Sequence, residues 1–278
     1  MAEIRTLLSD LVFVESPRWH AGRLWFSDWG ARTVLAVDLE GHSEVVARMQ
    51  SMPFCVDWTH DNRLLIVAGR EAKVLELQRD RSMPVLADLS GLSRHPWNEI
   101  VVHPSGNSYV NNIGFDFPGG EVQPGTIALV TPDGSARQVA DGLMFPNGMA
   151  ITPDGSTLIV AESYGGRLTA FNIEDNGALT NRRIWADLGG APPDGICLDS
   201  EGAVWYADVP NHHCVRVAEG GEVLQTLEVD RGCFSCALGG TDGRALFIVA
   251  AEWPMPADGS LGRTGQVLMA DAPAPAAG

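Results

Sequence analysis

The chain has 278 residues, of which 45% are hydrophobic and 19% charged, the composition of a folded globular protein rather than of a disordered chain. Nineteen Lys and Arg stand against 35 Asp and Glu, which gives a net charge of −16. This balance argues against nucleic acid or an anionic membrane as a partner, because both require clustered cations.

The N-terminal residues, the apolar runs and the cysteines do not predict a signal peptide, a membrane span or a zinc site. Residues 1–5 lack the basic segment and apolar core of a signal peptide, and apolar runs such as residues 245–251 are too short to cross a bilayer. Of the five cysteines, Cys233 and Cys236 form a CxxC without a second pair, so we expect buried, reduced thiols. We therefore expect a cytoplasmic protein.

One pattern recurs six times along the chain: an apolar stretch, a polar turn that ends in Gly or Asn, and a second apolar or aromatic stretch. The copies occupy residues 15–28, 54–68, 98–112, 147–162, 194–208 and 235–250. Their turn residues are Gly22, Asn62, Gly106, Gly155, Gly202 and Gly243, 40 to 49 residues apart. Each copy is typical of a β-hairpin, and the spacing is the length of a four-stranded propeller blade.

Further strand-like runs lie between the copies, for example residues 34–39, 126–130 and 167–173, and helical periodicity is nearly absent. The sequence therefore predicts an all-β fold, a six-bladed β-propeller, as a single domain over residues 1–278. Residues 4–8 are expected to pair with the last blade and cover its edge. The Ala- and Pro-rich tail, residues 271–278, is expected to be disordered.

Four of the six repeats place an oxygen-bearing side chain at the same position. Asn98, Asn147 and Asp194 each lie eight residues before the turn residue of their blade, and Glu15 lies seven before a turn that is one residue shorter. Because the innermost strands of a propeller line its central channel, these side chains should converge near one mouth. Carboxylates that face each other repel unless a cation or proton neutralises them, and this donor set suits a hard divalent cation.

Turn chemistry is the alternative explanation for these residues. Pro-Asp-Gly is a common turn signal, and Pro132-Asp133-Gly134 and Pro153-Asp154-Gly155 read as turns. Asn147-Gly148 fits the same description, whereas Asp194 shares its phase with Asn98 and Asn147. The shared phase favours a common site over four independent turns.

At these residues the sequence resembles the SMP-30/gluconolactonase/LRE family of regucalcin-like lactonases. The resemblance rests on motifs that follow in order at blade-length spacing: residues 15–19, 98–99, 145–148, 193–196 and 236–240. It implies a six-bladed propeller with one divalent ion, calcium being favoured and magnesium, manganese or zinc the alternatives.

The resemblance also implies roles for individual residues. Glu15, Asn147 and Asp194 would hold the metal, and Asp194 would also be the catalytic acid and base. Asn98 would contact the substrate or the metal, and Asp116 would be an acidic substrate contact.

Two departures from the family pattern concern the loop before Asn98. Glu99 stands where the family often has Asp, and Pro96 stands where some members have a substrate-binding Arg, the nearest arginine being Arg94. Arg94 is therefore the candidate substrate contact, and His95 and Trp97 are candidates for shaping a less polar pocket. The pattern leaves open whether His95, Trp97 or Glu162 takes part in the site.

These inferences together predict a metal-dependent hydrolase that opens a small lactone with an activated water. The alternatives are a promiscuous ester or phosphotriester hydrolase and a non-catalytic propeller that binds a ligand and is stabilised by its metal. The carboxylate at position 194 favours the enzyme. The oligomeric state is not predicted by any of these patterns.

Overall fold

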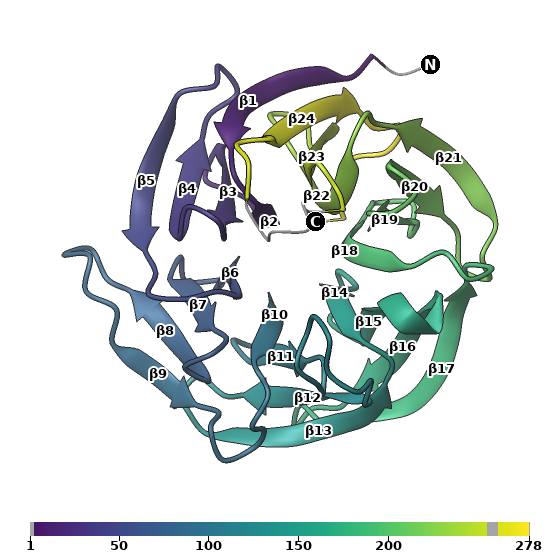
Figure 1. Ribbon diagram of the computed structural model, residues 1–278. Helices are drawn as coiled ribbons and strands as arrows, with labels where there is room; N and C mark the ends of the chain where they lie inside the picture. Colours follow the sequence, from purple (N-terminus) through teal and green to yellow (C-terminus); the bar gives the residue numbers. More distant parts are fainter. Residues whose placement is uncertain (1–2, 255–260, 278) are drawn as a thin grey trace.

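A computed structural model describes residues 3–254 and 261–277 and shows six four-stranded antiparallel sheets arranged in a ring (Figure 1). The first three blades are built from β2 (Val14–His20), β3 (Arg23–Asp28), β4 (Thr33–Val37) and β5 (Ser43–Arg48); β6 (Phe54–Trp58), β7 (Leu64–Ala68), β8 (Lys73–Leu77) and β9 (Val85–Asp88); and β10 (Trp97–Val102), β11 (Ser108–Asn112), β12 (Gly125–Val130) and β13 (Ala136–Leu143).

The other three blades are built from β14 (Pro146–Ile151), β15 (Thr157–Glu162), β16 (Arg167–Ile173) and β17 (Leu179–Asp187); β18 (Pro193–Leu198), β19 (Val204–Asp208), β20 (His213–Val217) and β21 (Val223–Glu228); and β22 (Gly232–Gly239), β23 (Ala245–Ala251), β24 (Gly265–Asp271) and β1 (Arg5–Leu11). A short 3-10 helix, η1 (Ser163–Gly165), follows β15. The six-bladed propeller predicted from the repeats is confirmed.

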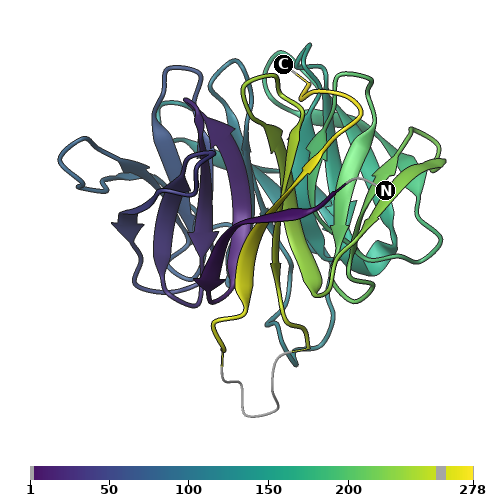
Figure 2. The same ribbon diagram turned by 90° about the horizontal axis from the view of Figure 1, so that it is seen from above.

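The ring closes through the N-terminal strand. β1 runs antiparallel to β24 on the outside of the last blade, as expected from the sequence (Figures 1 and 2). The last blade thus combines strands from both ends of the chain, and its outer edge is covered. No helix within the described part of the chain is long and apolar enough to span a bilayer.

The six turn residues of the repeats explain why Gly and Asn recur there. Gly22, Asn62, Gly106, Gly155, Gly202 and Gly243 all have left-handed backbone conformations, with φ between 63° and 90°. This region is open to Gly and tolerated by Asn, but unfavourable for most other residues. The repeat therefore marks the hairpin turns that join the first two strands of every blade.

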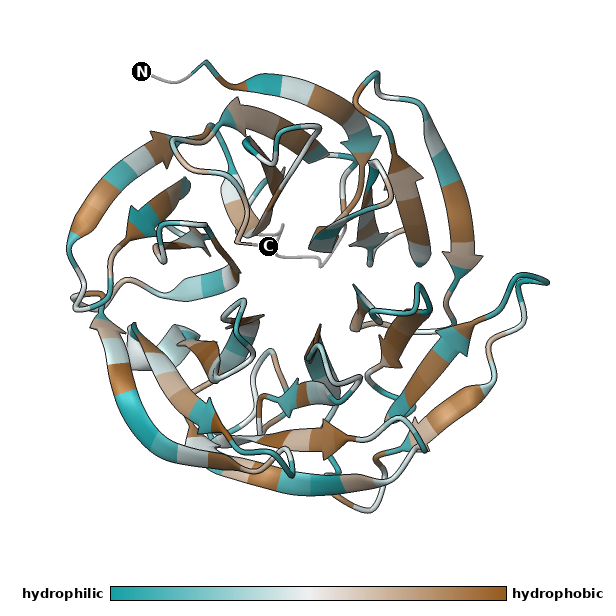
Figure 3. Cartoon of the chain, turned by 180° about the vertical axis from the view of Figure 1, so that it is seen from behind, coloured by the Kyte–Doolittle hydropathy of each residue, from teal (hydrophilic) through white to brown (hydrophobic). Residues whose placement is uncertain are grey.

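The hydrophobic core is divided among the contacts between neighbouring blades. Each of six core clusters combines side chains from two adjacent sheets, for example Leu24 and Phe26 of the first blade with Phe247 and Val249 of the last. Hydrophobic segments accordingly run along strands of every blade (Figure 3). The five cysteines are free thiols, and four of them are buried, as predicted.

The prediction of a disordered C-terminal tail is wrong for the described residues 271–277. Ala274 is 1% exposed, the Ala276 N–H donates to Gly243 O, and the Ser200 N–H donates to Pro275 O. Small Ala and Pro side chains allow the tail to pack closely on the hairpin turns of the last two blades. Since those turns end the inner strands, the tail lies on the face opposite the starts of these strands.

Candidate metal and substrate site

The four predicted oxygen donors all come from innermost strands that carry a β-bulge at the donor. Glu15 lies in β2, Asn98 in β10, Asn147 in β14 and Asp194 in β18. The register shifts lie between Glu15 and Arg18, Trp97 and Ile100, Pro146 and Met149, and Pro193 and Ile196. A bulge bends its strand and re-aims a side chain, which directs each donor to the axis. In β6, which has an unbroken register, the same position carries the buried Phe54.

Two glycines that follow the donors allow neighbouring blades to approach closely. A Cβ on Gly148 would lie 2.5 Å from Ile196 N, and a Cβ on Gly195 would lie 1.9 Å from Ser235 Oγ. Both glycines lie inside strands, so Asn147-Gly148 is not a turn. The sequence-based turn interpretation of this dipeptide is therefore wrong, and the glycines serve packing between blades.

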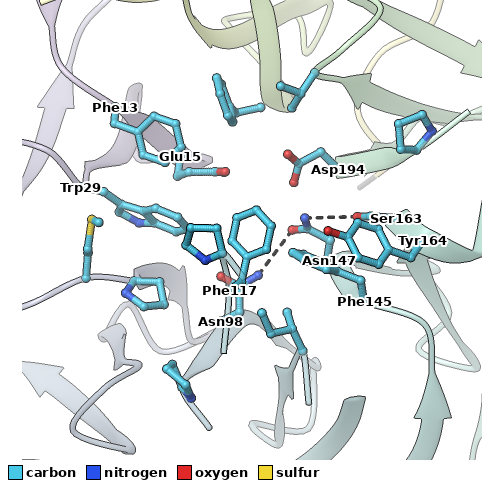
Figure 4. Close-up of a pocket in the computed structure, with 18 of the residues that line it drawn as sticks. Phe13, Glu15, Trp29, Asn98, Phe117, Phe145, Asn147, Ser163, Tyr164 and Asp194 are labelled. Carbon is cyan, nitrogen blue, oxygen red and sulfur yellow. Dashed lines mark hydrogen bonds between the residues drawn. The ribbon is translucent and has the colours of Figure 1, made fainter. Parts of the chain in front are cut away.

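The four donors surround one space at the start of the inner strands. In Figure 4 the Glu15 and Asp194 carboxyl groups point toward each other across it, with Asn98 and Asn147 beside them. Asn98 Nδ2 lies 3.5 Å from Asn147 Oδ1, and Asn147 Nδ2 lies 3.4 Å from Ser163 Oγ, long and weak contacts for polar groups. The amide groups therefore keep much of their capacity to bind something else.

The carboxyl groups around this space are buried, and the neighbouring groups do not offset the cost of burying their charge. Burial, and then the charges of Asp194 and Glu99, raise the pKa of Glu15 well above its usual value. Burial, and then the charge of Glu99, likewise raise the pKa of Asp194. Asp194 Oδ1 and Glu99 Oε1 are buried and have no hydrogen-bond partner. An oxygen-only donor set with orphaned, mutually repelling carboxylates fits a hard divalent cation.

Glu99 is the member of this cluster that sequence reasoning missed as a site residue. Its side chain is buried, and its Oε2 accepts a hydrogen bond from Arg18 Nη2 at 2.9 Å. Arg18 Nε also lies 3.4 Å from Asp57, so this cation is shared by two carboxylates. Burial would lower the pKa of Arg18, but Glu99 and Asp57 raise it. The shared phase points to Asn98 only, and nothing in the sequence pairs Glu99 with Arg18.

The loops that precede two donors are held by the last residue of the adjacent strand. Asp28 accepts hydrogen bonds from the N–H groups of Val12 and Phe13, just before Glu15. Glu162, which is fully buried, accepts from the Met144 N–H, just before Asn147.

Several hydrogen-bond donors surround the Glu162 carboxylate. It also accepts hydrogen bonds from Thr169, Arg167 and Arg182. Burial alone would raise the pKa of Glu162, but the hydrogen bonds from Arg167, Met144 and Thr169 lower it. Glu162 thus supports the site through the backbone and does not line it.

The structure does not bring the predicted substrate contacts Arg94 and Asp116 to this space. Both are exposed and neither lines the cavity beside the four donors. Arg94 Nε lies 3.3 Å from His95 Nε2, and His95 Nδ1 lies 3.2 Å from Asp116 Oδ1, so the three form a surface chain. Trp97 is buried in the core between the second and third blades. The expectation of substrate contacts from Arg94 and Asp116 is therefore not supported, because their loops point them to solvent.

A cavity of about 370 Å³ opens above the donors. Glu15, Asn98, Asn147 and Asp194 line it together with Ser163, and most of its remaining wall is apolar. Its volume falls in the range of small-molecule sites. Polar groups at one end and apolar walls elsewhere are the usual arrangement of a site that orients one reactive group of a ligand.

Another group of candidate metal ligands, Asp38, Glu40 and His42, lies on an exposed turn. Asp38 Oδ1 already accepts hydrogen bonds from the Glu40 and His42 N–H groups. This cluster is explained by the turn that it closes, and it does not adjoin the cavity.

Comparison with known proteins identifies a family to which the sequence is similar. Residues 13–252 match the family described as the SMP-30/Gluconolactonase/LRE-like region. Regucalcin from Danio rerio is 27% identical over 185 residues, which cover 64% of this chain and only 62% of that protein. Pentonolactonase XacC from Haloferax volcanii is 25% identical over 256 residues, or 89% of this chain and 84% of that protein.

Among solved structures, the gluconolactonase of Xanthomonas campestris has a TM-score of 0.80 and 24% identity, with 98% of this chain and 90% of that chain covered. At this identity the likeness shows a common fold. The family match, by contrast, spans most of the sequence and includes all four donors. The chain therefore belongs to the SMP-30/gluconolactonase/LRE-like family.

Proposed function

We propose that this protein is a metal-dependent hydrolase that opens a small lactone. The observation that carries the proposal is the ring of Glu15, Asn98, Asn147 and Asp194 at the polar end of an otherwise apolar cavity. Lactone hydrolysis is also the activity named for two of the relatives, the pentonolactonase and the gluconolactonase.

Glu15, Asn147 and Asp194 would hold the ion, with Asn98 as a fourth donor or a substrate contact. Two carboxylates and amide oxygens favour calcium over softer metals. A bound divalent cation would supply Lewis acidity, which polarises the lactone carbonyl and lowers the pKa of water.

Asp194 is proposed to carry the proton in both halves of the reaction. Its unpartnered Oδ1 lies buried at the cavity, where it can accept a proton from the water whose oxygen adds to the acyl carbon. When the ring C–O bond breaks, the same proton passes from Asp194 to the departing alkoxide. The products are a hydroxyl group and a carboxylic acid on one open chain, and the acid loses its proton to solvent.

The strands that carry Asn147 and Asp194 are proposed to hold these side chains in fixed positions for the reaction. Asn111 Nδ2 donates to Asn147 O at 2.6 Å, and Ser163 Oγ donates to Pro193 O at 2.7 Å, which ties the donor strands to their neighbours. Fixed side chains lower the cost of aligning water and carbonyl in the transition state.

The experiment compares Asp194→Asn with the parent protein by pH-stat titration of lactone opening, after calcium loading and against enzyme-free controls. The substitution keeps volume and an oxygen donor but removes the proton acceptor, so turnover should fall about 10²–10⁴-fold. Asp175→Asn, the same change on an exposed turn, is the matched control and should keep parental turnover. Near-parental turnover in Asp194→Asn would contradict the role of Asp194.

A further inference from the structure

The walls of the cavity indicate what kind of lactone it takes. We propose that the substrate is an uncharged lactone with an aromatic or extended alkyl body, and not a hydroxyl-rich sugar lactone. This inference rests on the proposed function and adds the chemical class of the substrate.

One wall is a continuous cluster of four aromatic rings. Phe115 and Phe117 come from the connection between β11 and β12, Phe145 from the residue before β14, and Tyr164 from η1. Ring centroids are 5.6 Å apart for Phe115 and Phe145, 5.3 Å for Phe117 and Phe145, and 4.7 Å for Phe145 and Tyr164. Phe117 and Tyr164 are 45% and 49% exposed, so this wall has apolar surface available to a ligand.

A second aromatic wall is contributed by the first and last blades. Phe13 lies 5.5 Å from Trp29 and 4.6 Å from Phe234 between ring centroids, and Phe234 lies 5.8 Å from Trp253. Figure 4 shows Phe13 and Trp29 on one side of the donors and Phe145 and Tyr164 on the other. A ligand whose carbonyl reaches the donors would therefore have its body between aromatic rings.

Three of the polar groups along these walls already have hydrogen-bond partners in the protein. Trp29 Nε1 donates to Phe54 O at 2.6 Å, and Ser163 Oγ donates to Pro193 O. Arg70 is exposed at the rim, where its Nε donates to Met52 O.

The balance of side chains disfavours a polyhydroxylated ligand. Sixteen of the 22 lining residues are apolar or aromatic, and four of the six others are the donors themselves. Hydroxyl groups of a sugar lactone would lose water along these walls without a partner, which costs roughly 5- to 150-fold in affinity for each group. An alkyl or aryl body would instead gain contact with the rings.

The test measures kcat/KM for three δ-lactones on the calcium-loaded protein: δ-nonalactone, which carries a butyl chain, the bare δ-valerolactone, and the hydroxylated δ-gluconolactone. Each value is divided by the spontaneous hydrolysis rate of the same lactone, which removes differences in intrinsic reactivity. We expect δ-nonalactone to exceed δ-gluconolactone at least tenfold, with δ-valerolactone between them. Equal or higher values for δ-gluconolactone would overturn the inference and leave the proposed function intact.

A pair of variants locates the effect on the aromatic wall. Phe117→Asn should lower kcat/KM for δ-nonalactone about tenfold, mainly through KM, and change δ-valerolactone less. Val122→Asn is the matched control, because Val122 lies on the same connection, has the same 45% exposure and does not line the cavity. Equal effects of the two substitutions would count against the wall.

A binding measurement separates this inference from the proposed function. The δ-lactam with the same butyl chain is not hydrolysed, and calorimetry on the parent protein should show that it binds at least tenfold more tightly than bare δ-valerolactam, with a negative heat-capacity change. If no lactone is opened but this preference holds, the proposed function fails and the apolar ligand class stands. If the two lactams bind equally, the inference fails whatever the activity.

Discussion

The close approach of two inner strands at the donors makes Gly148→Ala an informative perturbation. The added Cβ would lie 2.5 Å from Ile196 N and 2.7 Å from both Asp194 O and Gly195 Cα, where ordinary contact begins at 3.4 Å. The neighbours are backbone atoms, so the strands must separate by about 0.9 Å (3.4 minus 2.5 Å) to relieve the clash.

Two consequences follow from that displacement. Overpacking of this kind costs about 1–3 kcal/mol of unfolding free energy, or about 2–12 °C in melting temperature for a domain of this size. Separation of the strands would also move Asn147 from Asp194, and calcium–oxygen distances tolerate only about 0.3 Å of variation. Calcium affinity should therefore fall by at least about tenfold, beyond the loss of stability.

The assay combines thermal unfolding of the chelated protein with calorimetric titration of calcium. Gly91→Ala is the matched control, because a Cβ there meets nothing within 4 Å and its backbone is outside the left-handed region. That variant should keep parental stability or gain a few tenths of a kcal/mol. If Gly148→Ala melts and binds calcium like Gly91→Ala, the strands do not approach as described and the packing argument is refuted.

Three other outcomes are expected. Chelation should lower the melting temperature of the parent by about 5–10 °C relative to protein in calcium at about 100 times its dissociation constant, whereas an unchanged melting curve would mean that no ion is bound. Glu162→Ala should lower the free energy of unfolding by about 2–4 kcal/mol in denaturant titrations, because the Met144 N–H and the Thr169 hydroxyl lose a buried acceptor. A loss below about 0.5 kcal/mol would contradict the proposed role of Glu162 in supporting the site. Arg94→Ala and Asp116→Asn should each change kcat/KM less than about twofold, and a tenfold loss in either would place it at the substrate after all.

The fold could be predicted from the sequence because its signals are local and repeated. Gly22, Asn62 and their counterparts each mark a left-handed turn, and a residue counted back from the turn reaches the start of the inner strand. The shared distance from the turn also predicts that Glu15 and Asp194 lie close together, and both line the same cavity.

Other features of the site and of the tail depend on contacts between segments far apart in the sequence. The repeat pattern within one blade does not predict such contacts. Glu99 lies buried against Arg18, 81 residues earlier in the chain. Ala274 is buried by turns of other hairpins, although the composition around it is typical of a disordered segment. Arg94 is only the arginine nearest to the position where some family members have one, and Asp116 rests on the resemblance, but both side chains are exposed.

The aromatic walls of the cavity are likewise not predicted by the repeat pattern. Phe117 and Trp253 lie outside the strands and have no common phase with the repeats, so the repeat pattern makes no prediction about either residue. Only the closed ring brings Phe117 and Trp253 to the same cavity. The sequence thus predicts the donors of the site better than its substrate.

Lactone opening is proposed to require one ion at Glu15, Asn147 and Asp194, and a titration of activity tests this requirement directly. Protein stripped with a chelator is assayed in the pH-stat on its best δ-lactone while calcium is added in fractions of an equivalent, with Asp175→Asn treated alongside. We expect no turnover above the spontaneous rate in the stripped protein and a recovery that saturates at one calcium per chain. Full turnover in stripped protein from which elemental analysis finds no divalent metal would contradict the account.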